Sequence, residues 1–188
     1  MSHIKSFPDG KERCSWVTSD QIYVDYHDHE WGTVGRGQTQ LFEAICLEGF
    51  QAGLSWLTIL KRREGFRKAF EGFDIEAVAR FSVAKVEELM LDPGIIRNRA
   101  KINSAINNAQ VVLSNDLDLT KLLWSFAPQS PVTEEAGFSW HATSTESDAM
   151  SKALKKLGFS FVGSTTMYAL MQSSGMVQDH APGCFRRT

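Results

Sequence analysis

Residues 40–56 read QLFEAICLEGFQAGLSW, and this stretch organises the predicted fold. Leu41, Ile45 and Ala52 recur at helical spacing, so residues 40–51 predict a helix with an apolar face. Glu48 lies seven residues after Leu41 and three after Ile45, inside that face. A carboxylate buried there needs a cation, because isolated burial of a charge is costly. Glu48 therefore either pairs with an Arg or Lys at the edge of the face or meets a cationic ligand, and periodicity leaves both open.

Helical periodicity extends over most of the remaining chain. The further predicted helices cover residues 75–81, 95–113, 149–157 and 164–174. Asp74 is the expected N-cap of the first, and Thr145–Asp148 is the expected capping box before the third. Because we find no convincing alternating strand, internal repeat or linker, the sequence predicts a single all-α domain.

Composition limits the classes of function. The 188-residue chain is 43% hydrophobic and 22% charged, as expected of one globular domain with its own core. No stretch approaches the ~20 apolar residues of a membrane span, and the N-terminus lacks the apolar segment of a secretion signal. We therefore expect a cytoplasmic protein without a membrane partner. The formal net charge of −2 does not indicate a polyanionic partner, so nucleic-acid binding would depend on local basic clusters.

The cysteines and histidines near the two ends of the chain have the composition of a metal site. Cys14 precedes His27 by thirteen residues, and His180 precedes Cys184 by four. Two thiolates and two imidazoles are the ligands of a closed tetrahedral zinc site, with no open position for a catalytic water. His29 competes with His27, since residues two apart on a helix point in nearly opposite directions. The pattern indicates one structural Zn²⁺ that ties the two ends together.

Aromatic residues are concentrated on either side of the Glu48 helix. Trp16, Tyr23, Tyr26 and Trp31 precede it, and Trp56 follows it. Rings around a carboxylate form a pocket that favours a flat cation, through stacking and through charge attraction. The same rings are equally compatible with an aromatic core, where most Trp side chains are largely buried. Both interpretations remain open at this point.

Longer motifs resemble those of a known family. They are Arg13–Val17 (RCSWV), Tyr26–Gly32 (YHDHEWG), Leu41–Trp56, Gly94–Arg97 (GIIR), Ser151–Lys156 (SKALKK), Gly158–Phe159, Phe161–Gly163 and His180. In order and length these motifs resemble the DNA-3-methyladenine glycosylase I family. By this resemblance residues 13–188 form the glycosylase-like domain, and residues 1–12 are an N-terminal extension.

The resemblance implies a helix-hairpin-helix glycosylase fold and gives roles to the residues above. The family's structural zinc ligands correspond to Cys14, His27, His180 and Cys184, which selects His27 over His29. Its base-recognising carboxylate corresponds to Glu48. Its pocket residues correspond to Trp16, Tyr23, Tyr26 and Trp56, with Trp31 as a further member.

Contacts with DNA are implied by the same correspondence. Leu54, on the turn after the Glu48 helix, resembles a wedge residue that fills the duplex where a base has left. Residues 92–99 (DPGIIRNR) correspond to a hairpin whose backbone N–H groups, with the start of the next helix, hold a DNA phosphate. The expected contacts in it are Gly94, Ile95, Arg97 and Arg99. The expected partner is alkylated duplex DNA, bound by a monomer.

The implied activity is excision of 3-methyladenine without strand cleavage. Methylation at N3 gives adenine a positive charge, so the base leaves as a neutral group and needs little acid catalysis. The protein would flip the nucleotide, bind the base with Glu48 and stack Trp56 on it while water attacks the sugar. Many helix-hairpin-helix glycosylases carry an assisting aspartate beyond the hairpin, but Asp116 and Asp118 fall in a predicted polar loop. No lysine nucleophile is expected, although Lys101 lies close to the hairpin.

Two other functions are compatible with the sequence. One is a zinc-stapled helical interaction module without catalytic activity, whose aromatic pocket binds a cationic side chain of another protein. The other is a glycosylase for an oxidised or mismatched base, which is disfavoured because no acid is placed to activate a neutral leaving group. The sequence does not establish whether 3-methylguanine is also removed.

Overall fold

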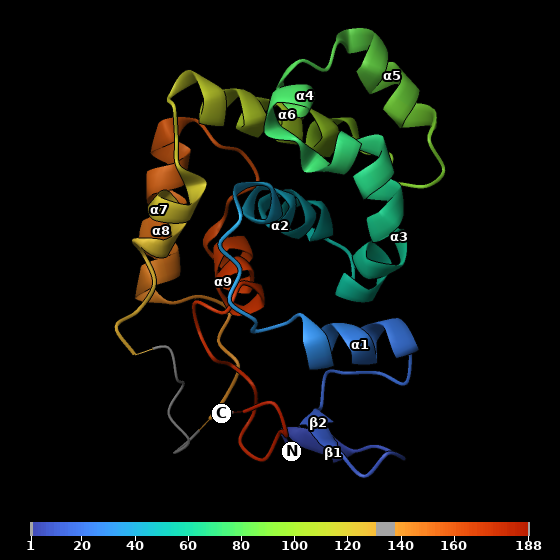
Figure 1. Cartoon of the computed structure of the whole chain (residues 1–188), viewed down its shortest axis with the longest axis vertical. Helices are drawn as coiled ribbons and strands as arrows, with labels where there is room; N and C mark the ends of the chain where they lie inside the picture. The colour runs from blue at the N-terminus through green and yellow to red at the C-terminus, as the bar shows by residue number, and fades with distance from the viewer. Residues whose placement is uncertain (1, 131–137, 188) are drawn as a thin grey trace.

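The computed structural model describes residues 2–130 and 138–187. Nine α-helices and two short strands are found in these residues (Figure 1). The helices are α1 (Gln21–His29), α2 (Gln38–Gln51), α3 (Trp56–Ala69), α4 (Ile75–Ala79), α5 (Val83–Leu91), α6 (Arg99–Ser114), α7 (Leu119–Trp124), α8 (Thr145–Leu157) and α9 (Ser164–Ser173), with a 3₁₀ turn, η1 (Glu71–Phe73), between α3 and α4. The predominantly helical prediction is confirmed. None of the helices in these two ranges is long and apolar enough to span a bilayer.

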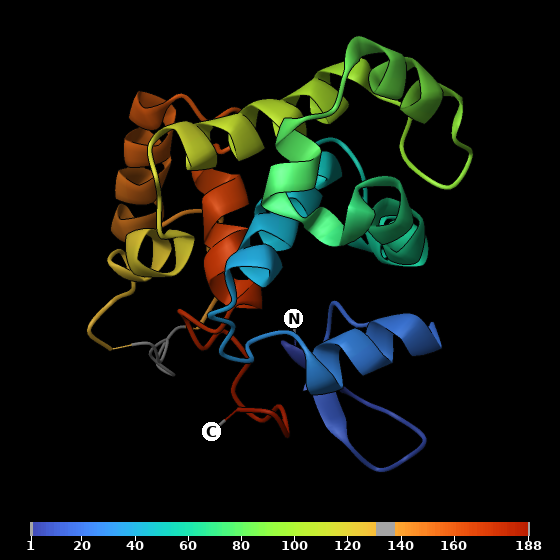
Figure 2. The ribbon, with the colours of Figure 1, turned by 45° about the horizontal axis from the view of Figure 1, so that its top comes forward.

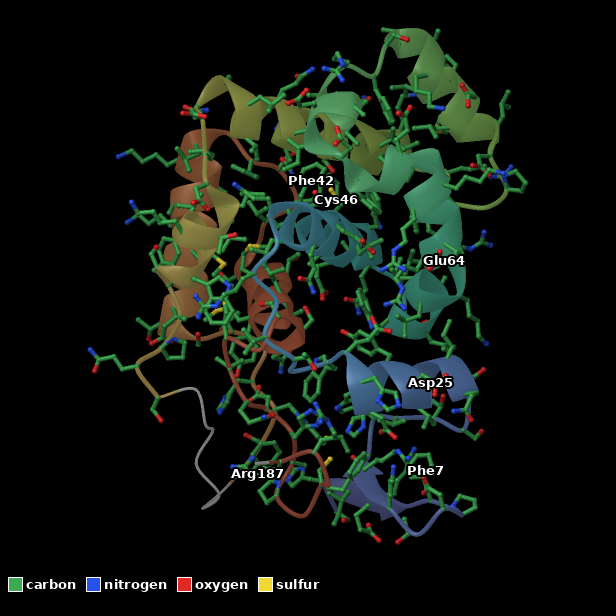
Figure 3. The ribbon with its side chains drawn as sticks, viewed as in Figure 1. Phe7, Asp25, Phe42, Cys46, Glu64 and Arg187 are labelled. Carbon is green, nitrogen blue, oxygen red and sulfur yellow. The ribbon has the colours of Figure 1, made fainter. Side chains whose placement is uncertain are left out.

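A small antiparallel hairpin corrects the expectation of a chain without strands. β1 (Ile4–Ser6) pairs with β2 (Glu12–Cys14), and Ile4 lies opposite Cys14. Strands of three residues are too short for an alternating pattern to be recognised in the sequence. The backbone N–H of Phe185 donates to the carbonyl of Glu12 at 2.9 Å, so the C-terminal segment lies against this hairpin. Figure 3 shows Phe7 and Arg187 at the same end of the molecule.

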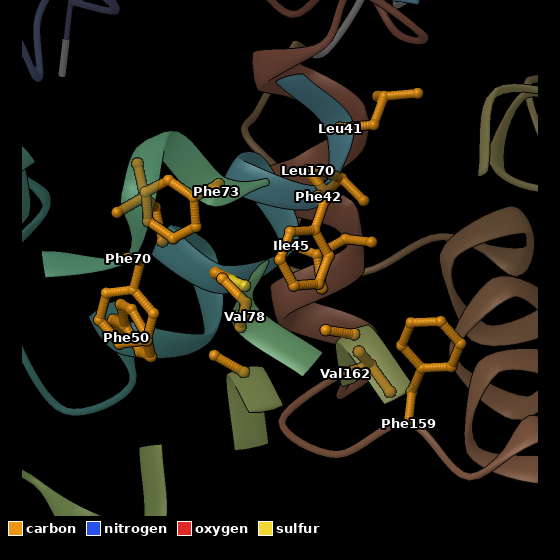
Figure 4. Packing of buried hydrophobic residues seen from close by; sticks show 14 of the residues in the cluster. Leu41, Phe42, Ile45, Phe50, Phe70, Phe73, Val78, Phe159, Val162 and Leu170 are labelled. Carbon is orange, nitrogen blue, oxygen red and sulfur yellow. The ribbon is translucent and has the colours of Figure 1, made fainter. Parts of the chain in front are cut away.

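The apolar face of α2 lies at the centre of the main core, where it packs against α3, α6, α7 and α9. Leu41, Phe42 and Ile45 are at most 1% exposed, and Figure 4 shows them within the cluster of buried residues to which Leu170 of α9 also belongs. Burial of each such side chain contributes roughly 1.5–3 kcal/mol. Ala52, expected on the same face, is instead exposed beyond the end of α2. The centre of the fold is therefore the helix that carries Glu48.

Several helix ends form as the sequence predicts. The side chain of Asp74 accepts a hydrogen bond from the Ala77 N–H at 2.8 Å and caps α4. The capping box of α8 is formed by Ser144 and Ser147, one residue earlier than expected, and Gly158 ends that helix with φ +101°. Local polar signals thus placed these boundaries to within about two residues, the usual uncertainty of helix ends.

The connection between α5 and α6, residues 92–98, lies against α3 (Figure 1 and Figure 2). Arg62 donates from Nη1 to the carbonyl of Pro93 at 2.7 Å. A Cβ atom on Gly65 would lie 2.4 Å from the carbonyl oxygen of Gly94. Only glycine at position 65 permits this close approach of α3 to the connection.

Gly65→Ala is therefore predicted to destabilise the fold. In an unhindered helix the same change would stabilise by roughly 0.5–1 kcal/mol. Here the new methyl group must push the Gly94 backbone away, and we expect the free energy of unfolding in urea to fall by about 1–3 kcal/mol. Lys68→Ala, at an exposed position of the same helix, should change it by less than about 0.5 kcal/mol. A Gly65→Ala protein as stable as the wild type would contradict the close packing.

Candidate functional site

Cys14, His27, His180 and Cys184 meet in space although they come from the two ends of the chain. All four are buried, and their ligand atoms lie within 4.8 Å of one another. The Sγ of Cys184 is 3.4 Å from His27 Nε2 and 3.7 Å from His180 Nδ1, and the Sγ of Cys14 is also 3.7 Å from His180 Nδ1. Atoms bound to one tetrahedral zinc ion would be roughly 3.3–3.8 Å apart. The geometry and the ligand types therefore fit a zinc ion.

Each imidazole of this cluster is oriented by its other nitrogen. His27 Nδ1 lies 2.8 Å from a carboxylate oxygen of Asp28, and His180 Nε2 lies 3.2 Å from the carbonyl of Trp31. An acceptor on the far nitrogen fixes the tautomer and leaves the near nitrogen free to bind a metal. His29, on the same helix as His27, is exposed and lies outside the cluster. The structure thus favours His27 over His29, the same residue that the family resemblance selected.

A buried ion pair between Arg13 and Asp28 holds the carboxylate that contacts His27 Nδ1. Arg13 is 2% exposed and donates from Nε and Nη2 to the two oxygens of Asp28, at 2.9 and 2.7 Å. Burial opposes ionisation of Asp28, but the hydrogen bonds from Arg13 and His27 outweigh it and lower the pKa of the carboxyl. In the cluster itself, the hydrogen bond from the Cys14 thiol is the largest influence on Cys184 and lowers the pKa of its thiol. The donor set is therefore arranged to hold a thiolate.

An aromatic pocket with a volume of about 330 Å³ lies beside the cluster. All six residues expected to form it line it: Trp16, Tyr23, Tyr26, Trp31, Glu48 and Trp56. The sequence analysis missed five others: Gln51, Trp140, His141, Ala169 and Gln172. Gln51 is one helical turn from Glu48 and was detectable by spacing. The other four come from distant segments, and no local signal identified them.

The cluster of Cys14, His27, His180 and Cys184 supports one wall of the pocket directly. The ring of Trp31 packs edge-on against His180, with centroids 4.6 Å apart and an interplanar angle of 84°. Trp16 packs against His27 at 5.3 Å and against Trp31 at 5.0 Å. Edge-to-face contacts of this kind are favourable and orient the rings. The positions of these two indoles therefore depend on the cluster.

Glu48 is buried in the pocket wall without an opposite charge. The residue is 5% exposed, and its carboxyl accepts one hydrogen bond, from the hydroxyl of Ser173 at 3.2 Å. Within residues 2–130 and 138–187, no Lys, Arg or His forms an ion pair with it. Burial raises its pKa from 4.5 to about 8, and the hydrogen bond from Ser173 offsets this only in part. The empty pocket therefore holds an acid that ionises most readily when a cation arrives.

Two arginines that line a cavity together with Glu48 are engaged by other acids. A second cavity of about 220 Å³ borders Glu48 and is lined by both Arg63 and Arg67. Arg63 donates to Glu30, with Nη2 2.8 Å from Oε1, and Arg67 donates from Nε to Glu43 at 2.8 Å. The pairing of Glu48 with an Arg or Lys, which the sequence left open, is therefore not found among the described residues.

Tyr26 lies next to Glu48 and stays neutral. It is 6% exposed, and burial, together with the nearby Glu48 and Glu30, raises the pKa of its phenol well above the usual value. Its ring packs against Trp56 with centroids 5.5 Å apart. The pocket thus combines flat apolar surfaces, phenolic hydroxyl groups and one buried acid.

The turn after α2 presents Leu54 to solvent. Leu54 is 38% exposed, and Ser55 caps α3 by accepting a hydrogen bond from the Thr58 N–H at 3.2 Å. The amine of Lys101 donates to the carbonyls of Phe50 and Ala52, at 2.8 and 2.6 Å, and holds the end of α2. Lys101 does not line the pocket.

Residues 92–99, which the resemblance implies to be a DNA-binding hairpin, differ in the groups that are accessible to a ligand. Arg97 is exposed and forms no ion pair with a described residue, whereas Arg99 pairs with Glu87, with Nη2 2.8 Å from Oε2. Ile95 is 2% exposed, so its side chain is buried. The Gly94 N–H donates to the side chain of Asp92 at 2.6 Å.

The two aspartates considered as assisting acids lie away from the pocket. Asp118 caps α7 by accepting from the Lys121 N–H at 2.9 Å. Asp116 is exposed, with a positive φ of +49° at the end of α6. Neither residue lines the pocket. Glu48 is the only carboxyl group among the described pocket-lining residues.

Comparison with known proteins gives a consistent result. A sequence model of the family described as methyladenine glycosylase matches residues 16–187. DNA-3-methyladenine glycosylase 1 of Escherichia coli (strain K12) is 49% identical over 92% of this chain and 95% of its own length. DNA-3-methyladenine glycosylase of Haemophilus influenzae is 45% identical over 92% and 96%.

Solved structures of such proteins have the same fold. A crystal structure of 3-methyladenine DNA glycosylase I superposes with a TM-score of 0.90 at 45% identity, covering 94% of this chain and all of that one. A variant of 3-methyladenine DNA glycosylase I in complex with 3-methyladenine superposes with a TM-score of 0.87 at 32% identity, covering 94% and 97%. With its matching sequence, fold and buried acid in an aromatic pocket, this chain belongs to the methyladenine glycosylase family.

Proposed function

We propose that this protein is a DNA-3-methyladenine glycosylase that removes N3-methyladenine from alkylated duplex DNA without cleaving the strand. The observation that carries the proposal is Glu48, a buried acid without a cationic partner that faces an aromatic pocket. Relatives 49% and 45% identical are named for this activity, and a structure 32% identical contains 3-methyladenine. Excision of this base belongs to base-excision repair of DNA damage.

Recognition of the base follows from its charge. While attached to deoxyribose, N3-methyladenine is a flat cation, and the pocket offers it rings for stacking and a carboxyl for charge attraction. Arrival of the cation favours the ionised form of Glu48, whose pKa in the empty pocket is about 8. The ionised carboxylate then accepts hydrogen bonds from the base, and Trp56 stacks on the ring. Neutral adenine can stack and donate hydrogen bonds from its amino group, but it gains no charge attraction.

Bond cleavage requires little from the protein. The methylated base already carries the positive charge that protonation would otherwise supply, so it leaves as a neutral molecule. The protein's tasks are to extrude the nucleotide, to hold the base and to stabilise an electron-poor sugar while water attacks it. This division agrees with a pocket that has one carboxyl group and no amine suited to covalent catalysis among its described lining residues.

Duplex DNA would be held by the exposed turn and hairpin. We assign the α5–α6 unit to the helix-hairpin-helix fold, with residues 92–98 as its hairpin, and assign phosphate contacts to its backbone and to Arg97. Arg99 would first have to leave Glu87. Leu54 would fill the space left in the base stack, since its side chain is exposed on a turn held by Lys101. Phosphate contacts make the affinity decrease as salt rises.

We propose that the Cys14, His27, His180 and Cys184 cluster binds one structural zinc ion. Four protein ligands leave no position for a reacting water, so the metal would cross-link the chain termini and supply no step of the reaction. Three free cysteines are consistent with a reducing compartment, and we place the protein in the cytoplasm as a monomer. The alternative of a non-catalytic interaction module has no support from the named relatives.

Glu48→Gln is predicted to abolish most of the excision activity. Loss of a charge-assisted hydrogen bond costs about 1.5–3 kcal/mol, which corresponds to a decrease in kcat/KM of about 10- to 150-fold. The assay is release of free 3-methyladenine from methylated duplex DNA. Glu76→Gln is the control, because Glu76 is an exposed acid of α4 that pairs with Arg80 and lines neither cavity beside Glu48. Full activity of Glu48→Gln would favour the interaction module or another recognition group.

Cys184→Ala is predicted to remove the metal and weaken the fold. The wild-type protein should contain one zinc per chain by atomic absorption, and the variant less than a tenth of that. Loss of a structural zinc ion should cost about 3 kcal/mol or more, lowering Tm by roughly 6–12 °C for a chain of this size. Cys46→Ala, at a core position outside the cluster, should keep its zinc. Undiminished zinc in Cys184→Ala would exclude the proposed ligand set.

A further inference from the structure

Asp179 connects the metal-ligand segment to the pocket wall. It directly precedes His180 and is 2% exposed. Its Oδ2 accepts hydrogen bonds from the hydroxyl of Tyr168 and from Nε2 of Gln172, both at 2.7 Å. Its backbone carbonyl accepts from the indole N–H of Trp140 at 3.1 Å. Two residues that line the pocket, Gln172 and Trp140, are therefore held by one buried aspartate.

These contacts fix the orientation of the Gln172 side chain. A carboxylate oxygen that receives a second donor, from Tyr168, can only accept, so the Gln172 amide must present its NH₂ group to Asp179. The amide carbonyl oxygen is then at the opposite end of the planar group. No described donor hydrogen bonds with that oxygen, although Gln172 lines the pocket. Gln172, a residue of the pocket wall, thus has a carbonyl oxygen that accepts no hydrogen bond from the described residues.

This acceptor belongs to the same region of the wall as Glu48. Ser173, the next residue of α9, donates its hydroxyl to Glu48 Oε1 at 3.2 Å. Both Gln172 and Glu48 line the pocket of about 330 Å³. A base in this pocket consequently meets two acceptors, the Glu48 carboxyl and the Gln172 carbonyl.

Two hydrogen-bond acceptors in the pocket wall favour a purine with an amino group at position 6. The exocyclic 6-amino group of adenine has two N–H donors, whereas guanine has an oxygen acceptor at the same position. We propose that Gln172 is a specificity-determining residue that accepts a hydrogen bond from the 6-amino group of the flipped base, and that Asp179 is its positioning residue. The inference rests on the proposed glycosylase function. It adds that 3-methylguanine is disfavoured, because its 6-oxo group would face acceptors without a proton to share.

The test compares two bases released from the same DNA. Duplex DNA treated with a methylating agent contains both 3-methyladenine and 3-methylguanine, which are separated by chromatography after excision. Gln172→Met keeps the length of the side chain but removes the acceptor. We expect kcat/KM for 3-methyladenine to fall at least tenfold and the ratio of 3-methylguanine to 3-methyladenine released to rise at least tenfold.

Further variants separate positioning from folding. Asp179→Ala should shift the ratio in the same direction as Gln172→Met, and Asp179→Asn, which keeps a carbonyl oxygen for Gln172, should restore most of the wild-type ratio. Gln110→Met is the control, since Gln110 is exposed on α6 away from the pocket. Zinc content and Tm of every variant report on the fold, and a folding defect alone would lower both activities without changing their ratio.

Two results would overturn the inference in distinguishable ways. A ratio within twofold of the wild type in Gln172→Met, with 3-methyladenine still released by the wild type, would remove the specificity role and leave the proposed function intact. Failure of the wild-type protein to release 3-methyladenine would remove the proposed function and this inference with it.

Discussion

The burial of the Glu48 carboxyl, which has no ion-pair partner among residues 2–130 and 138–187, is the constraint on which the site depends. The core places this residue at the pocket wall, because α2 is packed on several sides by other helices. Arg63 and Arg67 lie close enough to border the same cavity but are paired with other acids. An uncompensated acid costs free energy in the empty protein. A cationic base in the pocket would offset this cost by pairing with the Glu48 carboxylate. The positive charge of the base would therefore contribute to its recognition.

The cysteine and histidine cluster supports several of the side chains that form the pocket walls. Trp31 and Trp16 pack on imidazoles of the cluster, and Asp179, next to His180, holds two further lining residues. The pocket is therefore assembled from the first and last parts of the chain around a central helix. A metal that joins these parts would stabilise the pocket without taking part in the chemistry. Figure 1 shows both termini at the same end of the molecule, as such a link requires.

The sequence predicted what depends on neighbouring residues and missed what depends on packing. The helix around Glu48 and the cap at Asp74 were predictable, because periodicity and capping are local. The residues of the cysteine and histidine cluster were predictable because few residue types bind zinc in this number and spacing, and the family resemblance selected His27 over His29. Gln172 and Trp140 were missed, since only the folded chain shows which faces of distant segments meet the pocket. The family resemblance indicated the function. That Glu48 forms no ion pair with Arg63 or Arg67 could be seen only in the structure, which shows the acid with which each arginine pairs.

The most direct test of this account is a titration of the Glu48 carboxyl by ¹³C NMR, in the empty protein and with a permanently cationic methylated adenine. The account predicts a pKa near 8 in the empty pocket, because burial disfavours the charged form, and a clearly lower pKa when the cation is bound. The fold should accordingly lose stability as pH rises from 4.5 to 8 in the absence of ligand. A pKa near 4.5 in the empty protein, or one that the cation does not change, would contradict the account.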